Sequence, residues 1–312
     1  MNRSRIAAAF IVLVLLGSYY FFFEYRVKKK EINEKEERET IFYGVEKNSI
    51  VKIVNRNSRG AVEAVKENGS WELKQPAEKP ADKGFIEVFL DDIVNARASR
   101  VIETDNAGAY GIDPGKRSIA LADASGKEYI ALPGSLNPAG DSVYTGKAGR
   151  DGVFLLERKI LDNNEKDFFD FRFKGILDAV EDEISAVKVR LNKKKYDLLK
   201  KDGYWSVSGG EYAAASGVKA IIDGMTKSNV RAFLKGGANS TYFPGASKEY
   251  IEFTINGKKR TVYFGTHKEE ERIIFASEKG ADETAKLAYH VYESIPGAVS
   301  YTHLTLPTKR IV

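Results

Sequence analysis

The sequence contains no cysteine and only three histidines among its 312 residues. Disulfides, thiolate metal sites and cysteine nucleophiles are therefore excluded. One histidine lies in the C-terminal tail described below. Of the other two, His267 is predicted in an exposed loop and His290 on the face of a strand. A metal site needs three or four converging ligands, so we expect neither a metal site nor a cofactor.

Motifs for catalysis and nucleotide binding are also missing. No Gly-x-Ser-x-Gly segment places a serine at a strained strand–helix turn. Segment 111–118 lacks the first glycine and the final Ser or Thr of a phosphate loop, and the glycine-rich segment 236–241 lacks the flanking lysine. Asp91 and Asp92 are adjacent on a predicted helix, about 100° apart, and do not face one cleft. We expect no enzymatic activity; an unrecognised hydrolase is the remaining enzymatic alternative.

Charge of one sign does not form a long stripe along the chain. The net charge is +5 and the pI is about 9.0, yet the basic residues are interspersed with acidic ones. The chain has no basic stripe of the kind that binds nucleic acid, so nucleic acid is not an expected partner. With 43% hydrophobic and 30% charged residues, the composition is that of a folded body with room for two domains.

The long hydrophobic run begins at Ile6 and ends at Phe23, and it contains neither charge nor proline. As a helix it would be about 27 Å long, close to the ~30 Å hydrocarbon core of a bilayer. A cleaved signal peptide fits less well, because bulky aromatics occupy the place of the small residues at a cleavage site. A buried core helix is disfavoured because the run is apolar all round. We predict a transmembrane anchor with its flanks over residues 1–30, and a lipid bilayer as partner.

The orientation of this anchor is predicted from its flanks. Arg3 and Arg5 precede the run, and Arg26 and Lys28–Lys30 follow it, so counting basic residues does not favour an internal N-terminus. A short basic N-terminus before one apolar helix is nonetheless the usual signal-anchor layout, and long domains translocate largely regardless of charge. We expect a single-pass protein of the cell membrane with the bulk of the chain outside the cytoplasm.

Beyond a charged linker over residues 31–44, short β-type runs alternate with helical patterns. The runs at 51–54 and 61–65 are followed by an Asn-Gly turn, which is typical of a hairpin meander. Apolar residues at helical spacing predict a helix over 81–98. Further short strands follow as far as residue 156, and a helical pattern then closes the unit.

The same order of landmarks then occurs a second time. Trp71 corresponds to Trp205 at an offset of 134 residues. Gly134 and Gly265 end the next matched stretch at a slightly smaller offset, and we align segment 153–156 with segment 288–291. Loop insertions produce offsets that drift in this way, with chance matching as the alternative. We predict an α+β fold, in which an N-terminal transmembrane helix is followed by two tandem repeats of an antiparallel-sheet-plus-helices domain, at 45–180 and 181–298.

The C-terminal tail is excluded from the fold prediction. Segment 299–308 reads VSYTHLTLPT, and a DNA string that we recognise as a transposase-type sequencing adapter encodes it in one frame. We therefore expect residues 299–312 to be a non-native, adapter-derived tail after about Ala298. The second repeat would then be truncated, without a counterpart of residues 162–179, and its sheet would expose apolar surface.

Four segments of the first repeat form a recognisable set. They are the Asn-Gly-Ser-Trp strand ending at Trp71, the approach from Pro76 to Pro80, the Tyr-Gly-Ile-Asp-Pro loop over 110–114, and segment 171–177. Together they resemble the bacterial domain-of-unknown-function 4340 family over about residues 1–298. The resemblance implies a single-anchor envelope protein found beside ABC-type export systems related to the gliding-motility transporter. It implies no catalytic residue, because none is established for the family.

The anchor and the resemblance together predict a non-enzymatic accessory or scaffold protein of an ABC-type export or gliding-motility-related envelope complex. Its expected partner is an ABC transporter permease or accessory subunit. The expected contacts are two Asn-x-Arg pairs at helix ends and one exposed aromatic loop: Asn95, Arg97, Asn229, Arg231, Tyr242 and Phe243. The alternative function is an envelope binding module for glycan or peptide, which would use Trp71 or Trp205, although a buried core role suits both tryptophans better.

Overall fold

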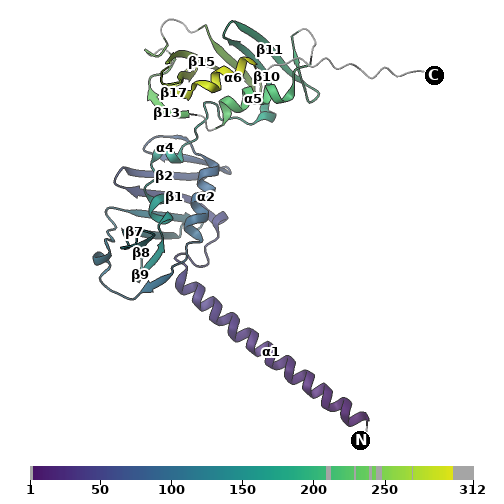
Figure 1. The fold of residues 1–312 in the computed structure, drawn as a ribbon, viewed down its shortest axis with the longest axis vertical. Helices are drawn as coiled ribbons and strands as arrows, with labels where there is room; N and C mark the ends of the chain where they lie inside the picture. Colours follow the sequence, from purple (N-terminus) through teal and green to yellow (C-terminus); the bar gives the residue numbers. More distant parts are fainter. Residues whose placement is uncertain are drawn as a thin grey trace, which may run out of the picture. The chain divides into compact units, whose positions relative to one another are not determined.

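The structure, a computed structural model, describes residues 3–208, 212–227, 230–238, 241–243, 248–268 and 270–297. The predicted tail at 299–312 lies outside these residues. The chain divides into two compact units, Met1–Arg172 and Phe173–Val312, and each contains one antiparallel sheet with helices (Figure 1). The predicted α+β fold, an apolar N-terminal helix followed by two sheet-and-helix domains, is confirmed. The units meet just after Arg172, a short distance before the predicted boundary at residue 180.

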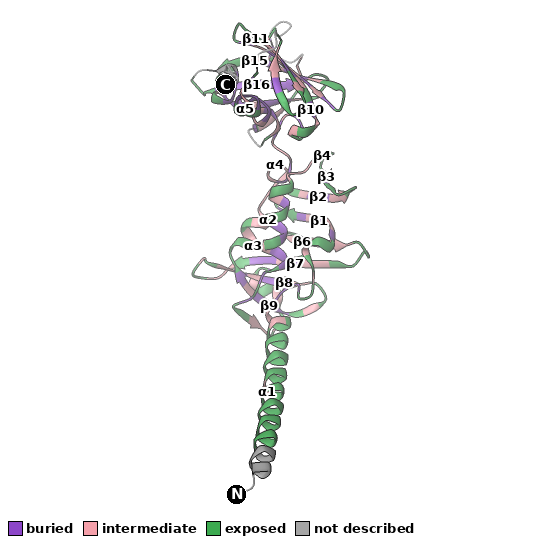
Figure 2. Cartoon of the chain, turned by 90° about the vertical axis from the view of Figure 1, so that its right-hand side faces the viewer, coloured by how far each residue is buried: buried purple, intermediate pink, exposed green. Residues whose placement is uncertain are grey.

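The N-terminal helix α1 (Arg3–Glu39) contains the whole predicted anchor and continues through most of the predicted linker. It is long and apolar enough to span a membrane. From Phe10 to Phe23 its large apolar side chains are exposed (Figure 2). An exposed apolar helix is stable where lipid covers it, which supports the single-pass anchor. The charged part that follows carries ion pairs one turn apart, such as Lys28 with Glu24, which favour helix by a few tenths of a kcal/mol each, about 0.2–0.5.

The first unit is built on a nine-stranded sheet in the order β4-β3-β2-β1-β6-β7-β8-β9-β5. Its strands are β1 (Ile50–Asn57), β2 (Gly60–Glu67), β3 (Ser70–Gln75), β4 (Lys79–Pro80), β5 (Arg100–Ile102), β6 (Ser118–Asp123), β7 (Glu128–Leu136), β8 (Ser142–Lys147) and β9 (Arg150–Glu157). Its other helices are α2 (Lys83–Val94), α3 (Lys159–Asn164), α4 (Phe168–Phe171) and the 3₁₀ turns η1 (Lys47–Ser49) and η2 (Ala107–Tyr110).

Helix α2 shows why these residues form these elements. Asp82 caps its N-terminus and accepts a hydrogen bond from the Phe85 backbone N–H at 3.0 Å. Its buried residues recur at the spacing of one helical face: Ile86, Phe89, Leu90, Ile93 and Val94. Phe171 closes this core from α4, with its ring edge-on to Phe85 at 4.9 Å and to Phe89 at 5.0 Å. The packing of these rings holds the chain after β9 against α2.

The second unit is built on an eight-stranded sheet in the order β12-β11-β10-β14-β15-β16-β17-β13. Its strands are β10 (Ile184–Leu191), β11 (Lys194–Lys201), β12 (Tyr204–Val207), β13 (Val230–Lys235), β14 (Tyr250–Ile255), β15 (Lys258–Lys268), β16 (Ile273–Glu278) and β17 (Glu283–Ala288). Its helices are α5 (Ala215–Thr226), α6 (Tyr289–Gly297) and the 3₁₀ turn η3 (Glu181–Glu183).

The two sheets correspond strand for strand once β4 is set aside. The correspondence extends to their irregularities. The pairing of β1 with β6 shifts register between Ile50 and Lys52, and that of β10 with β14 shifts between Ile184 and Ala186. A second shift, on β7 and β15, falls around Gly134 and Gly265 in the two sheets. The two sheets therefore correspond in their bulges as well as in their strand order.

The same bulge seats the same loop in both units. A Cβ atom on Gly134 would lie 2.5 Å from the Tyr110 carbonyl oxygen, and one on Gly265 would clash with that of Tyr242. The Tyr110 ring lies 4.9 Å from Tyr144, and the Tyr242 ring lies 4.4 Å from Phe275. Each glycine therefore allows a tyrosine loop to lie directly on its sheet.

The predicted alignment of 153–156 with 288–291 is wrong. Val143 pairs with Leu156 in the first sheet as Ile274 pairs with Leu287 in the second, so β17 is the counterpart of β9. His290 consequently lies in helix α6 and not on a strand. The segment Tyr289-His290-Val291 is too short, and too mixed in polarity, for its pattern to distinguish a strand from the start of a helix.

Helix α6 follows β17 as α3 follows β9, and it covers the second sheet where the sequence predicted exposed apolar surface. Val291, Tyr292 and Ile295 are buried in the same hydrophobic cluster as the buried face of α5. The other histidine, His267, is exposed as predicted but lies on β15 and not in a loop; its ring stacks on Tyr289 at 5.4 Å.

Candidate functional site

The end of helix α1 is held by the first unit through backbone bonds. The Ala98 N–H donates to the Glu39 carbonyl at 2.9 Å, and the Ile41 N–H donates to the Ala96 carbonyl at 3.2 Å. Immediately beyond α1, Ile41 and Phe42 are each 1% exposed and belong to the core of the sheet. The anchor helix is therefore joined to the first unit by a packed segment.

Two arginines strengthen this attachment. Arg97, one of the predicted partner contacts, pairs with Glu36 of α1 at 2.8 Å. Arg150 donates from its two terminal nitrogens to the carbonyls of Glu37 and Arg38, at 3.4 and 3.5 Å. The last carbonyls of a helix lack intrahelical partners and carry partial negative charge, so a guanidinium is a suitable cap. We call this region, comprising residues 34–43, Arg97 and Lys147–Arg150, the anchor junction.

A cavity of about 610 Å³ opens at the anchor junction. It is lined by charged residues of α1 and of the β8–β9 hairpin, which are Glu34, Glu37, Arg38, Lys147 and Arg150, together with Tyr43 and Gly149. The Lys147 ammonium lies 6.0 Å from the centre of the Phe42 ring. Partial burial lowers the pKa of Lys147, and the charges of Arg150 and Lys127 lower it further.

The other predicted contact residues do not gather at this junction. Asn95 is the exposed C-cap of α2. Asn229 lies outside the described residues, and Arg231 is exposed on β13 of the second unit. The aromatic loop is not exposed as predicted, because Phe243 is only 5% exposed and Tyr242 stacks on Phe275. The sequence signal, two adjacent aromatics before a proline, does not separate a contact loop from a packed one.

The family model described as a domain of unknown function (DUF4340) matches residues 71–246, more than half of the sequence. The chain belongs to the DUF4340 family. The matched segment begins at Trp71 on β3 and extends into the second unit, so the family model includes parts of both sheets. No curated protein and no solved structure matches the chain.

The tryptophans of this DUF4340 protein occupy core positions. Trp71 is 8% exposed and Trp205 is 4% exposed. Trp71 also lines a smaller cavity of about 300 Å³, whose other polar residues are Lys47, Asn48, Lys66, Lys83 and Glu87. Of the adjacent carboxylates, Asp91 pairs with Lys47 at 2.8 Å and Asp92 with Lys159 at 3.6 Å. Within the described part of the chain, no group of three or more His, Asp or Glu residues could hold a metal ion.

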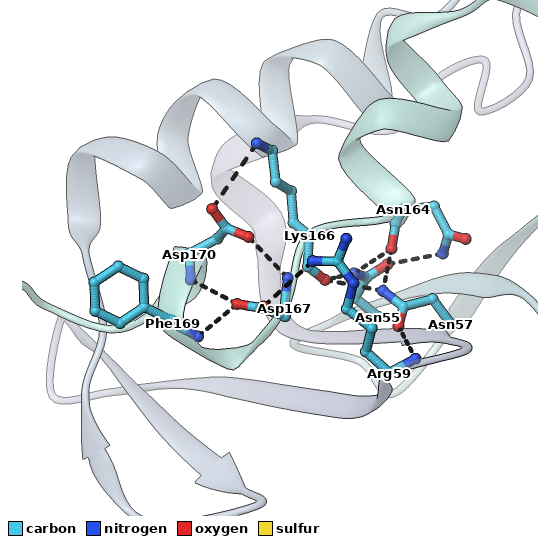
Figure 3. Close-up of polar contacts among 8 residues, drawn as sticks. All are labelled: Asn55, Asn57, Arg59, Asn164, Lys166, Asp167, Phe169 and Asp170. Atoms are coloured by element: carbon cyan, nitrogen blue, oxygen red, sulfur yellow. Dashed lines mark hydrogen bonds and ion pairs between the residues drawn. The ribbon is translucent and has the colours of Figure 1, made fainter. Parts of the chain in front are cut away.

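A buried amide network in the first unit was not predicted from the sequence (Figure 3). Asn55 on β1 donates to the carbonyls of Asn164 and Lys166, both at 3.0 Å, and accepts from the Asn164 amide at 2.9 Å. Asn57 donates to the same two carbonyls. Asp167 then caps α4 by accepting from the N–H groups of Phe169 and Asp170.

This network is a structural clasp and has no arrangement of acid, base and nucleophile. Asn55 and Asn164 are each fully buried, and hydrogen bonds offset most of the cost of burying their amides, although Oδ1 of Asn164 has no partner in the described part of the chain. The clasp fastens the chain that returns from α3 to the middle of the first sheet. The corresponding positions of β10 are Val189 and Leu191, which pack in the second core.

Proposed function

We propose that this DUF4340 protein is a membrane-anchored, non-enzymatic accessory or scaffold subunit of an ABC-type export or gliding-motility-related envelope complex. The observation that carries the proposal is the junction of α1 with the first unit. A helix that spans a bilayer and passes without interruption into a folded body positions that body relative to a membrane complex. The identity of the complex rests on the family resemblance given above.

The charged part of α1 determines the distance of the first unit from the bilayer. From Phe23 to Glu39 the helix rises about 24 Å at about 1.5 Å per residue. Charged side chains on all sides keep this part in water. We infer that the protein is single-pass, that its folded units lie on the outer side of the cell membrane, and that α1 serves as a spacer for them.

The corresponding strand orders and bulges support the further inference that the two units are tandem copies of one domain. A duplicated domain offers a partner two related surfaces on one chain. Two tethered contacts raise apparent affinity through effective concentration even where each is weak. This property suits a scaffold subunit of a larger assembly.

The alternative function, an envelope binding module for glycan or peptide, is favoured by the 300 Å³ cavity at Trp71. The indole contributes to its wall beside Lys47, Lys66 and Lys83. Aromatic rings beside polar side chains suit sugar or peptide ligands. The low exposure of Trp71 leaves only a small part of the ring for such contact.

Reciprocal co-purification tests the proposal. The tagged protein is solubilised in mild detergent from its native membrane, and an ABC-type permease, the proposed partner, is tagged in a second strain. We expect each tag to recover the other protein. A variant in which an unrelated transmembrane helix replaces residues 6–23 keeps the anchor junction and should still recover the permease if the folded units make the contact. If neither tag recovers the other protein while the chain binds purified cell-wall glycan, the scaffold function is wrong and the binding module is favoured.

A further inference from the structure

The corresponding sheets provide an internal comparison for the cavity at the anchor junction. In the first sheet Ala131 pairs with Lys147, and in the second Val262 pairs with Glu278. Lys147 and Glu278 therefore occupy equivalent positions of opposite charge. A difference between the residues that surround Lys147 and those that surround Glu278 is therefore a difference between the two units and not a difference in fold.

In the second unit this position is neutralised within the chain. Arg260 on β15 donates to both carboxylate oxygens of Glu278, at 2.6 and 2.7 Å, and also to the Asp178 carbonyl at 3.1 Å. This two-bond pairing is the strong form of an ion pair. The hydrogen bonds to Glu278 raise the pKa of Arg260. Charge and hydrogen-bonding capacity are thus satisfied here without a ligand.

In the first unit the equivalent position has no such partner. Tyr129 stands in place of Arg260, and its hydroxyl donates to Asp123 at 3.0 Å. Nothing in the described part of the chain pairs Lys147 with a carboxylate, and the cations Arg150 and Lys127 help to lower its pKa. Like charges repel one another in a partly buried site, so an anion placed between Lys147 and Arg150 would be stabilised. The two carboxylates that also line the cavity, Glu34 and Glu37, belong to helix α1.

The cavity walls provide donors for such an anion. Arg38, Lys147 and Arg150 all line it. The contacts of Arg150 with helix carbonyls are long, at 3.4 and 3.5 Å, and a guanidinium has five N–H donors. Of the two lining carboxylates, both on helix α1, Glu34 is paired with Lys30 at 3.6 Å and Glu37 remains in the wall. The sheet side of the cavity contributes only cations, Lys147 and Arg150, and Arg38 lines it from the helix.

We propose that the cavity at the anchor junction binds a phosphate group, held between Lys147 on the sheet and the guanidinium groups of Arg38 and Arg150. The phosphate belongs either to a free phosphorylated ligand or to a lipid headgroup. Arg38 stands about 22 Å along the helix from Phe23 at about 1.5 Å per residue, which favours a free ligand when α1 is upright. A phosphate-binding site is a property separate from the proposed scaffold function and does not depend on it.

The test uses the full-length protein in detergent micelles and inorganic phosphate as probe, with isothermal titration at constant ionic strength and chloride as the reference anion. We expect saturable phosphate binding. Lys147→Met should weaken it about tenfold or more, equivalent to about 1.4 kcal/mol, and Lys147→Arg should retain it. The matched control is Lys116→Met, which removes an exposed lysine of the same unit from its pair with Asp113. Unfolding midpoints read from tryptophan fluorescence confirm that each variant is folded.

A second measurement distinguishes the source of the phosphate. Micelles are doped with phosphatidylglycerol or phosphatidylcholine, and retained lipid is counted by native mass spectrometry. Phosphatidylglycerol retained by the parent and the Lys116→Met protein, but lost from Lys147→Met, supports the site with a headgroup as ligand. Saturable inorganic phosphate without lipid retention supports a free ligand. The proposal is overturned if neither ligand binds, or if the Lys147 and Lys116 variants bind alike.

Discussion

Replacing Asn55 by valine tests whether the buried amide clasp stabilises the first unit. Asn55 makes three hydrogen bonds to the Asn164–Lys166 segment, each worth about 1 kcal/mol net. Valine, the residue at the equivalent position of β10, recovers about 1 kcal/mol through apolar burial. We therefore expect Asn55→Val to lower the free energy of unfolding of this unit by about 2 kcal/mol.

The distribution of tryptophans allows each unit to be followed separately. The chain has two tryptophans, Trp71 in the first core and Trp205 in the second. In a Trp205→Phe background, urea unfolding observed by fluorescence reports the first unit alone. With a urea slope of about 2 kcal/mol per molar, the expected loss moves the midpoint down by about 1 M.

The reverse substitution at the equivalent position of the second unit is the matched control. Val189→Asn in a Trp71→Phe background places an amide in the second core, where Val189 is fully buried and β10 has no asparagine clasp to receive it. Burying an unbonded amide costs about 1–3 kcal/mol, so this midpoint should also fall. If Asn55→Val leaves its midpoint unchanged, the clasp does not stabilise the unit and the reasoning is refuted.

Three further predictions address the bulge, the anchor junction and one carboxyl group. Gly134→Ala, which brings a Cβ to 2.5 Å from a carbonyl oxygen, should cost about 1–3 kcal/mol in urea unfolding, whereas Gly84→Ala, with its nearest atom at 3.5 Å, should cost nothing. Arg97→Ala should change the free energy of unfolding by less than about 1 kcal/mol, because its ion pair with Glu36 is largely exposed. The same substitution should broaden the distribution of distances between spin labels on α1 and β6. An unchanged distribution would contradict a role of Arg97 in holding α1. Hydrogen bonds from Ser125 and Tyr129 lower the pKa of Asp123. Ionised Asp123 therefore stabilises the fold at pH values above the ordinary aspartate pKa, and this contribution is lost as the pH falls through the lowered pKa. Tyr129→Phe removes one of these bonds and should raise the pKa measured in a carboxyl-carbon NMR titration.

Features set by local sequence were the predictable ones. The run from Ile6 to Phe23 has no charge, and this alone predicts a membrane-length helix. The Asn68-Gly69 pair predicts a tight hairpin, and both residues have positive φ, 51° and 84°. The positions of Trp71 and Trp205 predicted that the second half repeats the order of the first, and the strand orders correspond accordingly.

Features that depend on distant partners could not be predicted. The local sequence shows Asn55 only as a polar residue in a strand, and its partner Asn164 lies 109 residues away along the chain. The sequence places Arg97 at the end of a predicted helix, where a basic side chain is usually solvated. Its partner Glu36 lies in the segment that the sequence predicts to be a linker. The contrast of Lys147 with Glu278 becomes visible only when strand register aligns the two sheets.

Because α1 continues directly into the first unit, a tilt of the helix moves that unit. Transmembrane helices commonly tilt by about 20°, and over the roughly 24 Å between Phe23 and Glu39 such a tilt shifts the root of the sheet sideways by about 8 Å. A change in bilayer thickness that alters the tilt would therefore displace the first unit parallel to the membrane. The backbone bonds of Glu39 with Ala98 and of Ile41 with Ala96 join the helix end to the sheet, so the first unit follows the end of α1.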